Sequence, residues 1–382
     1  MFRAALGKFG PAVRGVPQPT RGRLTTFRRL AQRADACVEF GTPEIVPATR
    51  RTIRNLPSDW PKLPTYRLSR PSAIVLDDVW LIGEHATPVT RDGRVLLSPY
   101  RNHPWSFALE RRADVDDFVR TRAFTASAER VHDGTLLSVV GRFDPNYFHW
   151  LTESCAQLEV LEVLRAKMAM KATVLTRSGG PAFQAESVRI VSPDVPTLGW
   201  NPAQGPLLVK RLVVPWQPGS GLGASPRSLA WLRARLLAAA GPVDRSDDRI
   251  YISRRPGAWR AVVNEDDVNT VLARHHVRPV QPESLSLLDQ VRMCAGARLI
   301  VGLHGAGLTN LIAAPHAALV ELRGAYGGAE YVNLAACLGA PYRGVRCSDL
   351  ANDDVTVPTD ELDRALADLD RWASTRDQRR NP

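Results

Sequence analysis

The sequence predicts an α/β protein of two domains, and three observations support this. The chain has 382 residues, which exceeds one ordinary hydrophobic core at about 150 residues per domain. Short apolar strand segments alternate with helical segments, most regularly in the second half, as in a doubly wound parallel sheet. Between the halves lies the glycine-rich stretch from Gln217 to Gly223, which is the best linker candidate by composition.

The first half begins with β-strands and then alternates strands with helices. Asp92-Gly93 between apolar runs predicts a hairpin. Strands are expected at 73–76, 79–82, 95–97, 135–140, 172–175 and 207–214, and helices at about 146–168 and 181–189. We assign residues 36–217 to an N-terminal domain with a β-rich start, which would bind the acceptor substrate.

The second half alternates more regularly. Ser225 and Pro226 are a favourable cap and first residue for a helix that ends near Ala240. Further strands are expected at 249–253, 277–280, 298–301, 318–322 and 342–345, with helices beginning at 264 and at 284 or 286, and one at 331–338. Residues 218–358 form the C-terminal domain in this prediction, and 359–382 form a final amphipathic helix and tail.

Charge is concentrated at the start of the chain. The formal net charge is +11 and arginine supplies most of it, which suits anionic substrates or anionic lipid because guanidinium groups pair bidentately with phosphates. Residues 1–35 are expected to be a basic, disordered tail, with attachment to a membrane surface and an organelle transit peptide as alternatives. The chain contains no apolar run near the ~18 residues of a membrane span. We therefore expect a cytoplasmic protein, or one peripheral at the inner face of the membrane.

The five cysteines are scattered without a C-x-x-C pair. Reduced structural thiols are the simplest interpretation, and a zinc site is not expected.

A glycine turn in the second half is the most informative segment. Residues 300–310 read IVGLHGAGLTN, so that a strand ends, glycines occupy the turn, and a helix can begin at Leu308. Gly305 and Gly307 allow close approach of an anion to the backbone, and a helix N-terminus adds donors. A tight turn without a ligand is the alternative. Glu321, at the end of the following strand, could accept hydrogen bonds from ribose hydroxyls or could pair with Arg323.

A second segment, NYFHWLTE, begins the long helix. Asn146, His149 and Glu153 share one helical face. A histidine and a carboxylate one turn apart can act as a base and its orienter, or Glu153 can take the proton with His149 tuning its pKa. The alternatives are a helix-capping asparagine with a surface His–Glu pair, and a metal site that lacks a nearby third ligand.

A third segment, YISRR, ends a predicted strand. Ser253, Arg254 and Arg255 therefore lie at the carboxyl edge of the sheet, where a doubly wound sheet binds its ligand. A guanidinium group there could hold a diphosphate, or the two arginines could be solvated.

In this order and spacing, the three segments resemble glycosyltransferase family 61. The resemblance covers about 73–345 and implies an inverting enzyme of GT-B architecture, with two Rossmann-like doubly wound domains facing across a cleft. It implies Glu153, His149 and Asn146 as catalytic residues. It further implies a nucleotide-sugar site at Ser253, Arg254, Arg255, His304, Gly305, Ala306, Gly307, Leu308, Thr309, Asn310 and Glu321. Gln290 also fits the family pattern, whereas Glu153 stands where many members carry aspartate.

The resemblance also implies the reaction and its partners. The implied donor is a UDP-linked nucleotide-sugar, and the implied acceptor is a hydroxyl of a free or lipid-linked glycan of the cell surface or capsule. No cofactor or metal is expected, because the D-x-D matches at 114–116 and 368–370 lie on probable amphipathic helices. The alternatives are a non-catalytic nucleotide-binding Rossmann protein and a basic nucleic-acid-binding protein. Nucleic acid is not expected, since aromatic residues make up only 7% of the chain.

Overall fold

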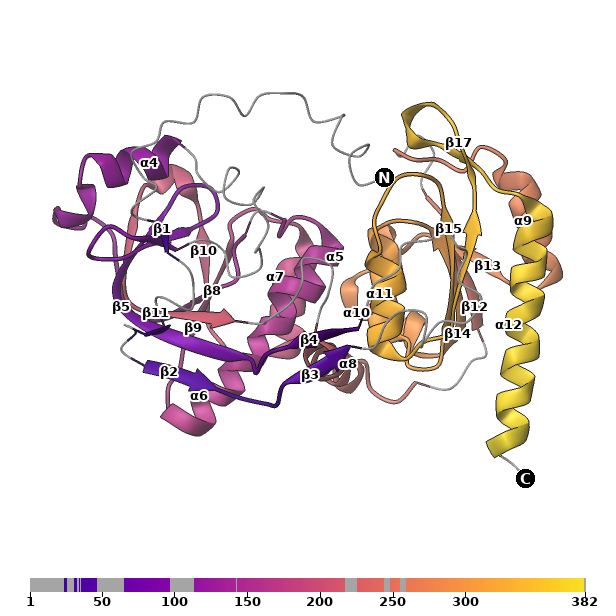
Figure 1. The fold of residues 1–382 in the computed structure, drawn as a ribbon, viewed down its shortest axis with the longest axis horizontal. Coiled ribbons are helices and arrows are strands. Elements are labelled where there is room, and N and C mark those ends of the chain that lie inside the picture. The colour runs from indigo at the N-terminus through magenta and orange to yellow at the C-terminus, as the bar shows by residue number, and fades with distance from the viewer. Residues whose placement is uncertain are drawn as a thin grey trace.

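A computed structural model describes residues 24–25, 31–32, 34, 36–46, 65–96, 113–141, 143–216, 225–243, 248–254 and 259–380. These residues form two units, each built on its own large sheet (Figure 1). The predicted linker at 217–223 and the predicted site residue Arg255 lie outside the described residues. Most of the basic tail, for which attachment to a membrane surface was an alternative, also lies outside the described residues.

The first unit is built on a nine-stranded sheet in the order β1-β7-β6-β5-β11-β8-β9-β10, with β2 paired to β5. Its strands are β1 Leu24–Thr25, β2 Ala36–Glu39, β5 Ser72–Ile82, β6 Thr87–Val89, β7 Val95–Leu96, β8 Val131–Ser138, β9 Thr173–Arg177, β10 Thr197–Trp200 and β11 Leu207–Trp216. Strands β11, β8, β9 and β10 run parallel, but β5 pairs antiparallel with β11, β6 and β2. The prediction of a doubly wound parallel sheet is therefore wrong for this unit. Short turns from β5 to β6 and from β6 to β7 can join only antiparallel strands.

The two strands predicted at 73–76 and 79–82 form a single strand, β5. The acidic residues between them are accommodated by cations of β11, because Arg211 lies 3.3 Å from Asp77 and Lys210 lies 3.0 Å from Asp78. The predicted hairpin at Asp92-Gly93 is confirmed. Gly93 has a φ of 74°, and the amide of Thr90 donates to the carbonyl of Arg94 at 2.9 Å.

Part of the predicted disordered tail is ordered. Leu24–Thr25 pairs in parallel with Val95–Leu96 at the edge of the sheet, and Ala31 and Ala34 pack against a buried apolar cluster. These residues of the predicted tail therefore have defined places on the first unit, where Ala31 and Ala34 cover apolar surface.

The helices of the first unit are α4 Ala113–Arg120, α5 Tyr147–His149, α6 Val160–Met168 and α7 Ala182–Val191. The predicted helix at 146–168 is one helical segment, but a π-helical turn, η2 Trp150–Ser154, and a 3₁₀ stretch, η3 Cys155–Glu159, separate α5 from α6. Irregular turns of this kind are frequent at functional sites. A small ribbon of β3 Glu44–Val46 and β4 Tyr66–Leu68 reaches toward the second unit (Figure 1).

The second unit contains the doubly wound parallel sheet that the sequence predicted. Its five strands are β12 Asp248–Ile252, β13 Arg278–Val280, β14 Ala297–Leu303, β15 Ala318–Arg323 and β16 Tyr342–Arg346. They lie in the order β13-β12-β14-β15-β16, with every neighbouring pair parallel. The strand order reverses between β12 and β14, and such a switch point is where open α/β sheets bind their ligands.

Helices cover both faces of this sheet. Helices α9 Glu265–Arg274 and α12 Thr359–Arg380 pack on the outer face, and α12 is the predicted final helix. On the inner face, toward the first unit, lie α10 Leu287–Ala295, the 3₁₀ helix η6 Ala306–Ala313 and α11 Glu330–Leu338 (Figure 1). A short pair, β17 Ser348–Asp349 and β18 Val355–Thr356, precedes α12.

The two units share one apolar core. Helix α8 Pro226–Ala240, capped by Ser225 as predicted, contacts α7 and η3 of the first unit and α10 and η6 of the second. A single buried cluster runs from Val213 of β11 through Leu229 and Leu232 of α8 to Ile252 of β12. The units are therefore packed against each other over this interface. No helix in the described part of the chain is long and apolar enough to cross a membrane.

Candidate active site

The turn that begins the long helical segment holds a histidine and a carboxylate together. Nδ1 of His149 lies 2.8 Å from Oε1 of Glu153, which is the pairing that their spacing predicted. Each side chain is about a quarter exposed. Asn146 caps the helix, since its Oδ1 accepts from the amides of Phe148 at 2.9 Å and His149 at 3.4 Å. The capping role that the sequence left open is therefore the one that this structure shows for Asn146.

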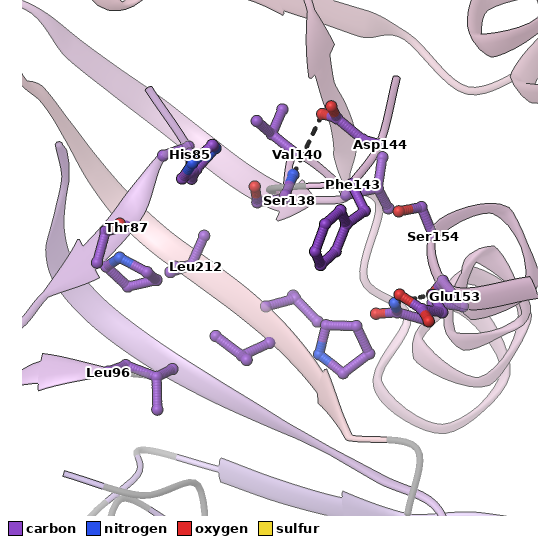
Figure 2. Close-up of a pocket in the computed structure, with 18 of the residues that line it drawn as sticks. His85, Thr87, Leu96, Ser138, Val140, Phe143, Asp144, Glu153, Ser154 and Leu212 are labelled. Carbon is purple, nitrogen blue, oxygen red and sulfur yellow. Dashed lines mark hydrogen bonds between the residues drawn. The ribbon is translucent and has the colours of Figure 1, made fainter. Parts of the chain in front are cut away.

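The His149–Glu153 pair lines a small cavity of about 100 Å³ in the first unit. Figure 2 shows Phe143, Asp144 and Glu153 on one side of it, and His85 and Thr87 on the other. His149 stacks on Phe143 with ring centroids 4.8 Å apart. Burial raises the pKa of Asp144, while an ion pair of 2.9 Å with Arg177 opposes the shift. The stacking on Phe143 and the Asp144–Arg177 ion pair thus hold this side of the cavity in place, and His149 and Glu153 both line it.

A larger cavity, of about 480 Å³, lies at the switch point of the second sheet. The first unit contributes Tyr147, Ala182, Phe183 and Glu186 to its lining. The second unit contributes predicted site residues, namely Ser253, Arg254, Gly305, Ala306, Gly307 and Leu308, together with Arg260, Glu283 and Gln290. Both units are therefore needed to form this cavity. Tyr147 lines it while His149 lines the smaller one, so the predicted catalytic pair and the predicted phosphate residues border two cavities that share one helical turn.

Two arginines converge on one carbonyl oxygen beside the larger cavity. Arg254 donates to the carbonyl of His304 at 2.9 Å, and Arg260 donates to the same oxygen at 2.8 Å. Burial lowers the pKa of both guanidinium groups, and the neighbouring charge of Arg260 lowers the pKa of Arg254 further. No carboxylate of the described residues lies within 4.0 Å of either group. Two partly buried positive charges therefore lie side by side with no ion-pair partner among the described residues, an arrangement that suits an anion site.

Aromatic rings hold Arg260 in place. Its guanidinium carbon lies 4.6 Å from the ring centroid of Trp259 and 4.2 Å from that of Tyr326, within the range of a cation–π contact. Both rings are exposed at the surface. Arg260 is thereby fixed at the cavity, although the sequence analysis did not assign it to the site.

The glycines of the turn are required by close approach. A Cβ atom on Gly305 would lie 2.2 Å from Nη2 of Arg254, and one on Gly307 would lie 3.0 Å from Cγ2 of Ile252. The backbone conformation of Gly305 is extended, so it is the arginine and not a strained turn that excludes a side chain. The predicted tight strand-to-helix turn is present, and its helix is η6.

Glu321 does not face the larger cavity, and its predicted contact with ribose is wrong in this structure. The residue is fully buried. One carboxylate oxygen is bonded to Nδ1 of His304, and the other accepts from the hydroxyl of Tyr342. The alternative partner, Arg323, lies at 4.0 Å. Glu321 therefore fixes the tautomer and orientation of His304, whose buried ring also lies outside the cavity lining.

Thr309 and Asn310 are also buried and do not line the larger cavity. The side chain of Asn310 accepts from the hydroxyl of Tyr147 at 2.8 Å and donates to Oε1 of Gln290 at 3.1 Å. Asn310 therefore positions two residues of the lining. Asn310 was predicted to contact the nucleotide. In this structure it acts on the cavity indirectly, through its hydrogen bonds to Tyr147 and Gln290.

Sequence reasoning missed several residues of the lining, among them Arg260, Glu283, Phe183 and Glu186. A signal was available for the first two: Arg260 follows Arg254 closely, and Glu283 follows the strand at 278–280. No local signal marks Phe183 and Glu186, because α7 reaches this cavity only through tertiary packing. Among the described residues, no group of three or more His, Cys, Asp or Glu side chains is arranged to hold a metal ion.

The D-x-D matches and the cysteines have structural roles in this fold. The acids of the D-x-D matches lie on α4 and α12, where the hydrophobic residues between them are buried and Asp368 pairs with Arg343 at 3.3 Å. All five cysteines are free. Burial raises the pKa of Cys155, Cys294 and Cys347 to about 12, which keeps these thiols protonated.

Comparison with known proteins relates this site to a family. Residues 147–320 match the family model described as Glycosyltransferase 61. The EGF domain-specific O-linked N-acetylglucosamine transferase of Drosophila melanogaster is 33% identical over 115 residues, covering 29% of this chain and 21% of that protein. The Mus musculus protein of the same description is 33% identical over 108 residues, covering 27% and 20%. The chain thus spans about a fifth of the length of the curated relatives that it matches. Over residues 147–320, which contain His149, Glu153, the arginines and the glycine turn, the chain is similar to glycosyltransferase family 61.

Proposed function

We propose that this protein transfers a sugar from a UDP-linked nucleotide-sugar to a hydroxyl of a glycan acceptor, with inversion at the anomeric carbon. One observation carries the proposal. Arg254 and Arg260, neither of which forms an ion pair with a described residue, present two positive charges to a cavity of about 480 Å³ at the switch point of a doubly wound sheet. The family similarity over residues 147–320 supports the same reaction class.

The donor site is the larger cavity. Its arginines are suited to a diphosphate, because guanidinium groups form charge-assisted, bidentate bonds with phosphate oxygens. Gly305 and Gly307 leave room for the anion beside Arg254. As the sugar is transferred, negative charge develops on the leaving diphosphate, and fixed cations in a water-poor site stabilise that charge. In this proposal the two units that line the cavity are the two halves of a GT-B architecture.

The acceptor site is the smaller cavity, and Glu153 is the base. The acceptor oxygen forms a bond to the anomeric carbon while the bond from that carbon to the diphosphate oxygen breaks with its electron pair. The acceptor proton passes to the Glu153 carboxylate, which His149 holds at 2.8 Å. Tyr147 borders the donor cavity and His149 borders the acceptor cavity, so transfer takes place at this helical turn.

The relatives suggest the first donor to test. Both are described as O-linked N-acetylglucosamine transferases, so UDP-N-acetylglucosamine heads the donor panel. The acceptor in our proposal is a glycan of the cell surface or capsule, because the acceptor cavity offers hydroxyl-binding groups such as His85, Thr87 and Ser138.

Calorimetry with UDP tests the donor site. We expect Arg254→Ala to weaken UDP binding by about tenfold to a hundredfold, since a hydrogen bond to a charged group contributes about 1.5–3 kcal/mol. Arg274→Ala is the matched control, because Arg274 is exposed on α9 at the outer face. Unchanged affinity in Arg254→Ala removes this residue from the donor site.

Turnover measurements test the base. Glu153→Gln keeps the shape of the side chain but cannot accept the proton, so we expect transfer to be lost while UDP affinity stays at the wild-type value. The control is Glu129→Gln, an exposed carboxylate outside both cavities. Retained turnover in Glu153→Gln shows that another group takes the proton.

A further inference from the structure

We propose that Glu283 binds the ribose hydroxyls of the donor nucleotide. This inference rests on the proposed donor site and adds a specificity-determining residue to it. The role is the one that the sequence suggested for Glu321, which the fold buries against His304 and Tyr342. Glu283 instead lines the larger cavity together with Arg254.

The position of Glu283 in the sheet suits this role. Glu283 follows β13, the strand that pairs with β12, so it lies at the same carboxyl edge as Ser253 and Arg254. Acidic side chains at this edge of doubly wound sheets accept hydrogen bonds from ribose. The location therefore places a hydrogen-bond acceptor within the ligand crevice, one strand away from the arginines.

A hydrogen-bonded turn holds the backbone of Glu283 in place. Pro282–Ser284 forms a 3₁₀ turn in which Pro282 is buried. The amide of Leu285 donates to the carbonyl of Pro282 at 2.9 Å, and the hydroxyl of Ser284 donates to the carbonyl of Gln281 at 2.8 Å. The backbone of Glu283 is thus fixed before a ligand binds, which reduces the entropy cost of binding.

The positive and negative groups around the cavity favour different chemical groups of a ligand. Burial and Arg260 lower the pKa of Arg254, and the negative charge of Glu283 opposes them, so the carboxylate and the guanidinium act on each other through the cavity. They do not form an ion pair within 4.0 Å, which leaves space between them. A carboxylate repels phosphate and attracts hydroxyl donors. A ligand that satisfies both groups carries an anion at one end and a diol further along, as a nucleoside diphosphate does.

The other acidic groups nearby are already engaged. Glu186 also lines the cavity, but its Oε2 accepts from the amide of Leu287 at 2.7 Å and so caps α10. Glu321 has both oxygens bonded within the protein. Glu283, an exposed residue, has no hydrogen-bond or ion-pair partner among the described residues.

Calorimetry with three nucleotides and inorganic pyrophosphate tests the proposal on the full chain. We expect the wild type to bind UDP about tenfold more tightly than 2′-deoxy-UDP or 3′-deoxy-UDP, as for a hydrogen bond to a charged group. In Glu283→Ala and Glu283→Gln, UDP affinity should fall to that of the deoxy analogues. Pyrophosphate affinity should stay unchanged or rise, because the variants remove a negative charge from the cavity.

Glu129→Gln, with the same loss of charge at an exposed site, should retain the preference for UDP over both analogues. Thermal unfolding of each Glu283 variant checks that the fold is intact, as expected for an exposed side chain. If Glu283→Ala still prefers UDP over both deoxy analogues, the ribose assignment is wrong, while the donor site stands as long as Arg254→Ala weakens UDP binding. If the wild type binds neither UDP nor pyrophosphate, the donor site and the ribose assignment are overturned together.

Discussion

The hydroxyl of Tyr147 donates a hydrogen bond of 2.8 Å to Oδ1 of Asn310, and this bond joins the two units. Tyr147 lies six residues before Glu153, and Asn310 lies in η6 after the glycine turn. Burial raises the pKa of Tyr147 well above its usual value, so the hydroxyl remains protonated and can donate. The bond therefore fixes the helical turn of the proposed base relative to the proposed diphosphate site.

Replacing Tyr147 with phenylalanine should destabilise the protein by about 1–2 kcal/mol, because the buried acceptor of Asn310 loses its donor. We also expect slower transfer, since the two sites are no longer held in register. Denaturant unfolding and turnover with UDP-N-acetylglucosamine measure the two effects. Tyr326→Phe, at an exposed ring, should change stability by less than about 0.5 kcal/mol. Equal stability of Tyr147→Phe and the wild type would contradict the structural role of the bond.

Replacing Gly305 with alanine should weaken UDP binding at least tenfold. The new methyl group would lie 2.2 Å from Nη2 of Arg254, so the guanidinium has to leave its position at the cavity. Calorimetry measures the affinity. Gly141→Ala is the control, because a Cβ atom at Gly141 meets no atom within 4 Å. Wild-type affinity in Gly305→Ala would show that the position of Arg254 is not critical for the nucleotide.

Replacing Glu321 with glutamine should lower the free energy of unfolding by about 1–3 kcal/mol, the cost of disturbing a buried hydrogen-bond network. The amide presents an NH₂ group where the carboxylate accepted from His304 or Tyr342, so one donor faces another. UDP affinity should fall severalfold as well, because both arginines are held by the carbonyl of His304.

Glu129→Gln serves again as the control for the Glu321 variant, since it changes the same functional group at the surface. An unfolding free energy that is the same in Glu321→Gln and the wild type would show that the His304–Glu321 contact contributes nothing to the fold. A stability loss with unchanged UDP affinity would show that His304 does not position the arginines.

The elements that the sequence predicted correctly are those with local signals. The strands and helices of the second unit follow the periodicity of their own side chains, and their alternation fixes a parallel sheet. The His149–Glu153 pair depends only on helical spacing, which the π-helical turn preserves. Gly305 was predicted to allow close approach of an anion, and in this structure the atom that lies close to it is Nη2 of Arg254.

The errors concern pairings between distant residues. The antiparallel pairing of β5 with β11 joins segments more than a hundred residues apart, and the apolar pattern of a strand does not specify the direction of its partner. Glu321 looked like a ligand-binding acid because it ends a strand, yet Tyr342 of the next strand and His304 of the previous one enclose it. Phe183 and Glu186 join the cavity by packing alone.

By itself, the sequence determined the second sheet, the glycine turn at its switch point and the histidine–carboxylate pair, because each depends on residues close together in the chain. Only the tertiary structure decided which charged groups remain available to a ligand. Arg254, Arg260 and Glu283 line a cavity without an ion-pair partner among the described residues, whereas both carboxylate oxygens of Glu321 are hydrogen-bonded inside the core. The physical reason is that the environment of a charge is set by every side chain that folding brings around it, and those side chains come from both units.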